Sequence, residues 1–116
     1  MRVLIIENES FLAESLCQYL CDLCCIDGEY VTTRYDAMQR LSRQRYDLVL
    51  TDLNLPDARG DEWILEIGAK RPGQRIVVMS SYPVPECLES SDCIQVIAYL
   101  EKPFDIHALV NIILPE

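Results

Sequence analysis

Short apolar runs alternate along the chain with segments of helical period. Four runs are rich in β-branched residues and apolar without interruption, and they cover residues 3–6, 48–51, 76–79 and 96–100. Continuous apolarity is typical of strands buried on both faces, as in a parallel sheet covered by helices. The pattern therefore predicts four buried strands, and a weaker fifth strand is predicted over 29–33.

The segments between the strands repeat their apolar positions every three or four residues, as helices do. Helices are predicted over 10–25, 36–43, 61–70 and 106–114, with a short one near 86–91. Pro83 and Pro85 weaken that short helix, because proline breaks helix interiors. A β-α unit repeated five times predicts a single α/β domain over residues 1–116.

Capping signals support these boundaries. Ser10 and Asp105 each stand just before a periodic apolar run, where their side chains suit a helix N-terminus. Gly28 and the pair Pro72-Gly73 provide the matching stop signals.

Composition narrows the class of protein. The 116 residues include 10 Lys and Arg against 19 Asp and Glu, a net charge of −9. An acidic surface repels phosphate backbones and anionic lipid, so contact with nucleic acid or a membrane is not expected. The apolar run at 3–6 meets Glu7 too early for a signal peptide, and no run is long enough to span a bilayer. A cytoplasmic location is expected.

Six cysteines raise the question of disulfides or metal. Four of them crowd together at positions 17, 21, 24 and 25. Cys21 and Cys24 form a C-x-x-C near the end of a predicted helix, where the dipole raises a thiol pKa, and one helix cannot surround a tetrahedral metal. Reduced thiols are expected, with Cys17, Cys21 and Cys24 buried or half-buried on a stripe that also holds leucines.

Polar residues follow the predicted strands and point to a site. They are Glu7 and Asn8, Asp52, Ser80 and Ser81, and Lys102. Ligands of parallel α/β sheets bind at the carboxyl ends of the strands. Carboxylate and amide oxygens suit Mg²⁺, and a carboxylate such as Asp52 can attack a phosphoryl group while Lys102 and the metal neutralise its oxygens.

Four stretches, at 3–9, 47–56, 77–81 and 99–104, with Gly60 eight residues beyond Asp52, resemble the receiver domains of two-component response regulators. The resemblance covers essentially the whole chain. It implies a flavodoxin-like, doubly wound (βα)5 fold with a five-stranded parallel sheet in the order 2-1-3-4-5. It also implies a signalling phosphoacceptor, whose chemistry is limited to its own phosphorylation and dephosphorylation, rather than an enzyme.

The resemblance assigns the phosphorylation site residue by residue. Asp52 matches the phosphoacceptor and Lys102 the lysine that contacts the phosphoryl group, with a cis bond expected before Pro103. The Mg²⁺ ligands would be Glu7, Asn8, Asp52 and the backbone carbonyl of Asn54.

The resemblance also assigns a switch. Ser80 matches the hydroxyl that turns toward the phosphoryl group, and Tyr99 matches the aromatic residue whose rotamer follows it. The surface formed by the fourth helix, fifth strand and fifth helix would then control an output partner. His107 is given no catalytic role, and Trp63 is expected in or beside the core.

Two features depart from the family pattern. Asn8 replaces an aspartate that usually binds the metal directly, and the lost charge predicts weaker Mg²⁺ binding with the pocket retained. Residues 95–98 replace the usual glycine and alanine before the aromatic, which is expected to stiffen or redirect the loop before the fifth strand.

The leading hypothesis is a phosphorelay receiver that takes its phosphoryl group from a histidine kinase or phosphotransfer protein. An output domain outside this segment and a homodimer are both compatible with it. A pseudo-receiver acting without phosphorylation is the alternative, since Asn8 weakens the metal site. An aspartyl-phosphate hydrolase fits less well, because Asn54 stands where its second acid would be, and no phosphate loop of a flavin carrier follows Ile6.

Overall fold

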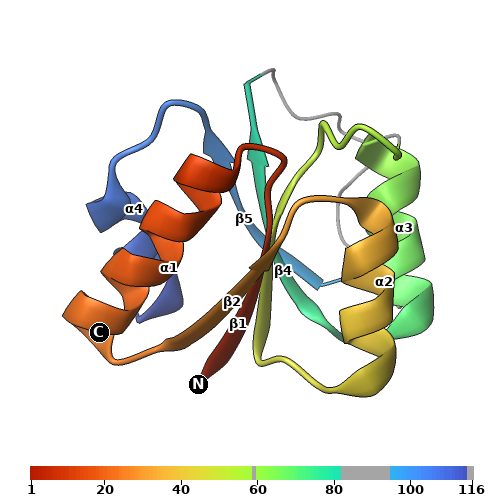
Figure 1. Cartoon of the computed structure of the whole chain (residues 1–116), viewed down its shortest axis with the longest axis horizontal. Coiled ribbons are helices and arrows are strands. Elements are labelled where there is room, and N and C mark those ends of the chain that lie inside the picture. Colours follow the sequence, from red (N-terminus) through yellow and green to blue (C-terminus); the bar gives the residue numbers. More distant parts are fainter. Residues whose placement is uncertain (59, 82–94, 115–116) are drawn as a thin grey trace.

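Five parallel strands form the centre of the structure, a computed structural model that describes residues 1–58, 60–81 and 95–114 (Figure 1). The elements in chain order are β1 (Arg2–Ile6), α1 (Ser10–Cys24), β2 (Asp27–Val31), α2 (Arg34–Arg43), β3 (Leu48–Asp52), α3 (Gly60–Lys70), β4 (Arg75–Ser80), β5 (Gln95–Glu101) and α4 (Ile106–Ile113). The strand order is β2-β1-β3-β4-β5, so the expected order 2-1-3-4-5 is confirmed. The short helix predicted near 86–91 lies outside the described residues.

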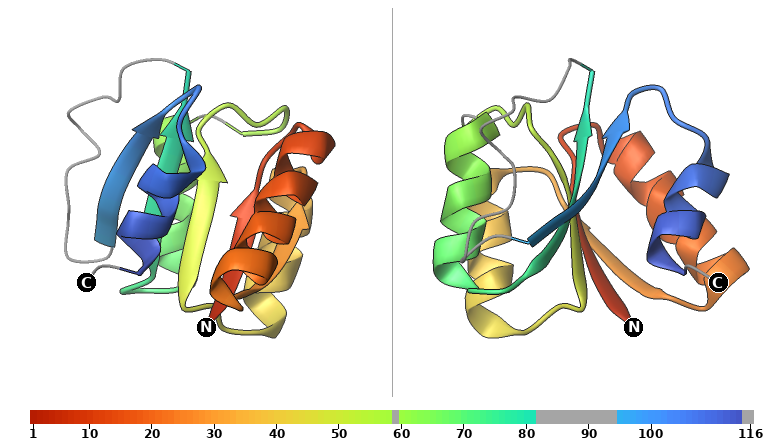
Figure 2. Two further views of the ribbon diagram at one scale, coloured as in Figure 1. Left: turned by 90° about the vertical axis from the view of Figure 1, so that its left-hand side faces the viewer. Right: turned by 180° about the vertical axis from the view of Figure 1, so that it is seen from behind.

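Helices cover both faces of the sheet, with α1 and α4 on one side and α2 and α3 on the other (Figures 1 and 2). Successive strand residues point to opposite faces. Leu4 and Ile6 of β1 therefore pack in the core under α2 and α3, while Val3 and Ile5 pack under α1 and α4. The central strands β1, β3 and β4 are therefore apolar at most positions, which is the origin of their continuous runs in the sequence, whereas the edge strand β2 carries Asp27 and Glu29.

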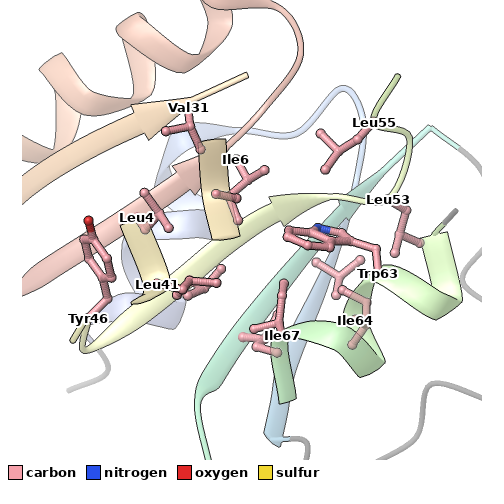
Figure 3. Packing of buried hydrophobic residues seen from close by; sticks show 14 residues of the cluster. Leu4, Ile6, Val31, Leu41, Tyr46, Leu53, Leu55, Trp63, Ile64 and Ile67 are labelled. Atoms are coloured by element: carbon pink, nitrogen blue, oxygen red, sulfur yellow. The ribbon is translucent and has the colours of Figure 1, made fainter. Parts of the chain in front are cut away.

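The largest buried side chain belongs to Trp63 of α3, which is fully buried as expected (Figure 3). Its indole Nε1 donates a hydrogen bond to Oγ1 of Thr51 in β3 at 2.9 Å. Gly60 at the start of α3 lies so close to the chain after β3 that an added Cβ would be 3.1 Å from the Leu53 carbonyl oxygen. These contacts fix α3 against the strand that ends in Asp52.

Of the two N-terminal caps predicted from the sequence, one is confirmed. Asp105 caps α4, because its Oδ1 accepts the N–H of His107 at 2.9 Å. The prediction that Ser10 caps α1 is wrong: Ser10 is the first helical residue, and Glu9 occupies the cap position without a side-chain cap bond.

The predicted stop at Gly28 is also wrong. α1 ends at Cys24, and Cys25 adopts the left-handed conformation (φ 55°) while its N–H bonds to carbonyls of the last turn. Gly28 instead lies within β2 and pairs with Val3 of β1. The stop at Pro72-Gly73 is confirmed, since Gly73 takes φ 82° in the turn after α3.

The four described cysteines are free thiols, as expected. Cys17 and Cys24 are half-buried, and burial raises the pKa of Cys17 to about 11. Cys21 is exposed, contrary to the prediction. The reason is that the buried face of α1 centres on Ala13, Leu16 and Leu20, and Cys21 lies beyond its edge.

Residues 95–98 form the first part of β5, in agreement with the strand predicted over 96–100. The loop before β5 lies outside the described residues, so the expected effect on that loop stays a prediction. Val96 pairs with Ile76 and Ala98 with Val77, so Ile97 forms a bulge in the ladder. Val96 and Ile97 are β-branched, which favours the extended backbone of this irregular strand pairing.

Candidate functional site

The carboxyl ends of the strands bring the predicted site residues together at one edge of the sheet, at the top of Figure 1. Lys102, directly after β5, donates hydrogen bonds from Nζ to Oε2 of Glu7 at 2.7 Å and to Oδ2 of Asp52 at 2.8 Å. Glu7 directly follows β1, and Asp52 ends β3. Three strands thus contribute one charged group each to a single cluster.

This cluster is largely withdrawn from solvent. Glu7 is 0% exposed, Asp52 is 3% exposed, and the Lys102 side chain is 17% exposed. Burial raises the pKa of Glu7, and the charge of Asp52 adds to the increase, although Lys102 opposes it. Burial alone would lower the pKa of Lys102, but its hydrogen bonds to Asp52 and Glu7 raise it above the ordinary value. Lys102 is therefore a firmly held ammonium group between two carboxyl groups.

The second oxygen of Asp52 is also engaged. The Asn54 backbone N–H donates to Oδ1 at 2.8 Å, while the neighbouring Leu53 N–H bonds to the Met79 carbonyl of β4. Both carboxylate oxygens of Asp52 thus have donors, which fixes the plane of the group. The same carboxylate lines a cavity of about 460 Å³, shared with Asn8, Glu9, Leu12, Asn54, Ser81 and Lys102.

The chemistry of this cavity suits a hard divalent cation. Among the described residues, no group of three or more His, Cys, Asp or Glu side chains is arranged to hold a metal ion. The lining does offer the oxygens of Asp52, Glu9 and the amides of Asn8 and Asn54. Mg²⁺ commonly binds one or two protein carboxylates and retains several waters, so this sparse oxygen set fits it.

Glu9 is a lining residue that the sequence reasoning missed. It sits at the N-cap position of α1 with no side-chain cap bond, and its N–H donates to Oε1 of Glu7 at 3.3 Å. Its position directly after Glu7 and Asn8 was the available signal. With Glu9 included, two acidic side chains face the cavity despite the amide at Asn8.

Asp57 is a second residue that sequence reasoning missed. It lies in the loop after β3, and its carboxylate oxygens accept the N–H groups of Arg34 at 2.7 Å and Tyr35 at 3.1 Å, at the start of α2. Burial would raise the pKa of Asp57, but these N–H donors hold it below the usual value. Arg34 also donates from Nε to Glu66 of α3 at 2.7 Å. The loop that carries Asn54 is therefore anchored to the start of α2, which the contact between Arg34 and Glu66 joins to α3.

The residues expected to form a switch flank the cluster. Ser80 ends β4 and is 2% exposed, and its carbonyl accepts the Lys102 N–H at 2.7 Å. Tyr99 in β5 pairs with Val78 and is 38% exposed. The expected cis bond between Lys102 and Pro103 is present.

An apolar groove of about 460 Å³ borders the site between α1 and the loop after β5. Its lining consists of Glu9, Leu12, Ser15, Leu16, Tyr19, Ser81, Lys102, Pro103, Phe104 and Ile106. Tyr19 of this lining is 50% exposed, and Phe11, also on α1, is 87% exposed. Exposed aromatic groups next to a groove are typical of surfaces that bind other proteins. No helix in the described ranges has the length and apolarity needed to cross a membrane.

Comparison with known proteins agrees with this architecture. The swarming motility regulation protein RssB of Serratia marcescens is 29% identical over 111 residues, which are 96% of this chain and 50% of RssB. The chain spans about half the length of the curated relatives that match it along its length.

Solved structures give the same result. A response regulator receiver domain protein of Methanospirillum hungatei JF-1 superposes with a TM-score of 0.84 at 25% identity, covering 97% of this chain and 89% of that one. A sensor protein of Polaromonas sp. JS666 superposes with a TM-score of 0.78 at 30% identity, covering 96% and 90%. The family model of the response regulator receiver domain matches residues 3–114. The chain belongs to the response regulator receiver domain family, the signalling phosphoacceptors of two-component systems.

Proposed function

We propose that this receiver accepts a phosphoryl group on Asp52 from a histidine kinase or phosphotransfer protein, with Mg²⁺ as cofactor. The observation that carries the proposal is the arrangement of Asp52. Its carboxylate lines a cavity whose oxygen atoms can coordinate a metal ion. Lys102, which follows β5, donates a hydrogen bond to the same carboxylate. Proteins of this family act as signalling phosphoacceptors rather than as enzymes on other substrates.

The residues have distinct tasks in this transfer. An oxygen of Asp52 attacks phosphorus as the bond from phosphorus to the histidine nitrogen of the donor breaks, leaving neutral histidine after it takes up a proton. Lys102 stays near Asp52 and neutralises the charge of the incoming phosphoryl oxygens. Mg²⁺, when bound, would neutralise the same oxygens. Glu7, Asn8, Asp52 and the backbone carbonyl of Asn54 would hold it, with Glu9 as an additional acid near the ion.

Asn8 sets the strength of that metal site. An amide oxygen coordinates Mg²⁺ but carries no formal charge, so attraction to the ion is weaker than with a carboxylate at the same position. The exposure of Asn8 at the cavity supports direct access to the ion. We therefore expect phosphorylation to require more Mg²⁺ than in receivers with an acid at this position.

The proposed switch runs from Asp52 through Ser80 to Tyr99. The Ser80 hydroxyl would turn toward the phosphoryl oxygens, and Tyr99 would move into the space released. The surface reached in this way includes β5 and α4, and we propose that it controls an output partner or an output domain outside this segment. A cytoplasmic location is consistent with a histidine kinase and an output partner. The receiver is also compatible with a homodimer.

The apolar groove beside α1 is the proposed contact surface for the phosphodonor. It shares Glu9, Leu12, Ser81 and Lys102 with the cavity at Asp52. A donor protein seated on the groove would therefore bring its phosphohistidine close to the acceptor.

The test is chemical phosphorylation of the whole chain. With Mg²⁺ and a small phosphodonor, intact-mass measurement should show the gain of one phosphoryl group in wild type and none in Asp52→Asn. Asp36→Asn is the matched control, because Asp36 is exposed in the first turn of α2 and should leave labelling unchanged. Equal labelling of wild type and Asp52→Asn would contradict the assignment. Absence of labelling in wild type at high Mg²⁺ would instead favour the pseudo-receiver, which Asn8 makes the second candidate.

A further inference from the structure

Eight of the ten basic residues of this acidic chain fall into two groups; of the other two, Arg43 lines a different cavity and Arg59 lies outside the described residues. One group forms ion pairs with acids: Arg2, Arg34, Arg40 and Lys102. A second group lines one cavity of about 490 Å³ and consists of Arg45, Lys70, Arg71 and Arg75. Within the described part of the chain, these four form no ion pair with an acid, although the sequence contains 19 Asp and Glu.

This basic cavity lies at the opposite end of the sheet from Asp52. Arg45 is in the turn between α2 and β3, Lys70 ends α3, and Arg75 begins β4. Both turns are at the lower edge of the molecule in Figure 1, whereas the strands end at the upper edge. The cavity is therefore separate from the phosphorylation site.

The walls of the basic cavity are fixed by hydrogen bonds. Arg71 donates from Nε to the Leu41 carbonyl at 2.8 Å, which joins the turn after α3 to the end of α2. Gln74, buried beneath the turn, donates from Nε2 to the Tyr46 carbonyl at 3.2 Å and to the Arg75 carbonyl at 3.1 Å. The cavity is formed before any ligand arrives, which reduces the entropy cost of binding.

Helix ends explain only part of this positive charge. Cations near a helix C-terminus are stabilised by its partial negative charge, and this accounts for Lys70 in the last turn of α3 and for Arg71. Arg45 and Arg75 lie outside the helices. Among the described residues of the lining, Asp47 is the one acid, and its Oδ2 already accepts the backbone N–H of Arg2 at 2.7 Å. Four cations against one acid leave the cavity strongly positive in a chain of net charge −9.

We propose that the basic cavity binds a small polyanion that carries two or more linked phosphate groups, such as pyrophosphate or a nucleoside diphosphate. Guanidinium groups match phosphate oxygens with paired N–H donors, and a concave wall of one charge concentrates the field. A preformed cavity of this volume is of the size used for small ligands. Arg45 and Arg75 would contact phosphate, while Arg71 holds the wall.

Calorimetric titration of the full chain with pyrophosphate and with ADP tests this, in the presence of a chelator so that no metal site contributes. Both ligands should bind saturably at one site. Arg45→Ala and Arg75→Ala should each weaken binding by about tenfold or more, the loss expected for hydrogen bonds to a charged group. Arg43→Ala is the matched control: it removes the same charge from the end of α2, but Arg43 lines a different cavity, and the change should be under about twofold.

Amide NMR shifts locate the ligand independently of affinity. Shifts over residues 45–47 and 70–75 support the proposal. In the calorimetry, equal affinity for pyrophosphate and ADP indicates that only the phosphates are recognised. Tighter binding of ADP indicates that the nucleoside also contacts the protein. The proposal would be overturned by no saturable binding of either ligand at millimolar concentration, by shifts confined to Glu7, Asp52 and Lys102, or by equal weakening in Arg43→Ala. Tighter binding of a poly-glutamate peptide than of pyrophosphate would also overturn it, and would identify an acidic protein as the ligand.

Discussion

Replacing Lys102 with methionine isolates the electrostatic role of the lysine between Glu7 and Asp52. The change keeps an unbranched apolar chain of similar length but removes the ammonium group. Wild-type Lys102 donates to both carboxylates, which are 0% and 3% exposed. In the variant, two buried acids would face each other without the cation.

The magnitude follows from the geometry. Since each carboxylate oxygen is within 2.8 Å of the same nitrogen, the two oxygens are at most about 5.5 Å apart. Two negative charges at about that distance repel by about 3 kcal/mol at an effective dielectric of about 20. Glu7 can escape this repulsion by binding a proton, and from its ordinary pKa of 4.5 that costs about 3.4 kcal/mol at pH 7. Both routes give a destabilisation near 3 kcal/mol at pH 7.

The pH dependence has a definite sign. In the variant, burial and Asp52 raise the pKa of Glu7 with no lysine to oppose them, so the folded state binds a proton that the unfolded state has released. Stability must then rise as the pH falls toward the unfolded pKa. At pH 5 protonation of Glu7 costs only about 0.7 kcal/mol, so the difference from wild type should shrink to about 1 kcal/mol.

Urea unfolding, followed by the fluorescence of the buried Trp63 in the presence of a chelator, measures these differences from pH 5 to pH 8. Lys70→Met is the matched control, since Lys70 is the other lysine of the chain and is exposed. Its effect should stay within about 0.5 kcal/mol at every pH. A Lys102→Met loss that is the same at pH 5 and pH 8 would refute the electrostatic reasoning, and a loss no larger than the control would show that Lys102 does not bridge the acids in solution.

Two further predictions concern the neighbouring loops. Asn8→Asp should tighten Mg²⁺ binding in calorimetry and should not increase stability without metal, because the new charge faces Asp52; equal Mg²⁺ affinity would mean that residue 8 does not contact the ion. Asp57→Ala and Thr33→Ala should each cost about 1 kcal/mol, since both side chains cap the start of α2. Only Asp57→Ala should also slow phosphorylation of Asp52, because only Asp57 anchors the loop that carries Asn54; equal slowing in both variants would reduce Asp57 to a helix cap.

The fold was largely predictable because strands that are buried on both faces of the sheet need uninterrupted apolar runs, which are visible in the sequence. The uninterrupted apolar runs identified β1, β3, β4 and β5 to within one or two residues at each end. The edge strand β2 was placed two residues too late, at 29–33 instead of Asp27–Val31. Its first residues are held by pairing with Arg2 and Val3, which local apolarity does not reveal, and Thr33, despite its β-propensity, caps α2.

The sequence predicted which residues form the candidate site, but not all of the contacts that hold them. The strand-end rule and the family motifs selected Glu7, Asp52 and Lys102, and the structure brings these three together. The anchoring of the Asp52 loop by Asp57 was missed, because it depends on how α2 approaches the turn after β3. The Asp57 contacts join residues more than 20 positions apart, and neither the strand-end rule nor a family motif covers them.

The roles of Asn8 and Lys102 both depend on the balance of charge at the carboxyl ends of the strands. Among the described residues, Lys102 is the single cation bonded to Glu7 and Asp52. Without metal, a third carboxylate at position 8 would add negative charge that this one ammonium group cannot balance. Asn8 therefore favours the metal-free state, at the cost of attraction for Mg²⁺. The two effects act in the same direction on the binding equilibrium, because binding is measured against the metal-free state. If Asp52 accepts phosphoryl groups only with Mg²⁺ present, Asn8 makes the response of this receiver depend on Mg²⁺ concentration over a higher range than a carboxylate would.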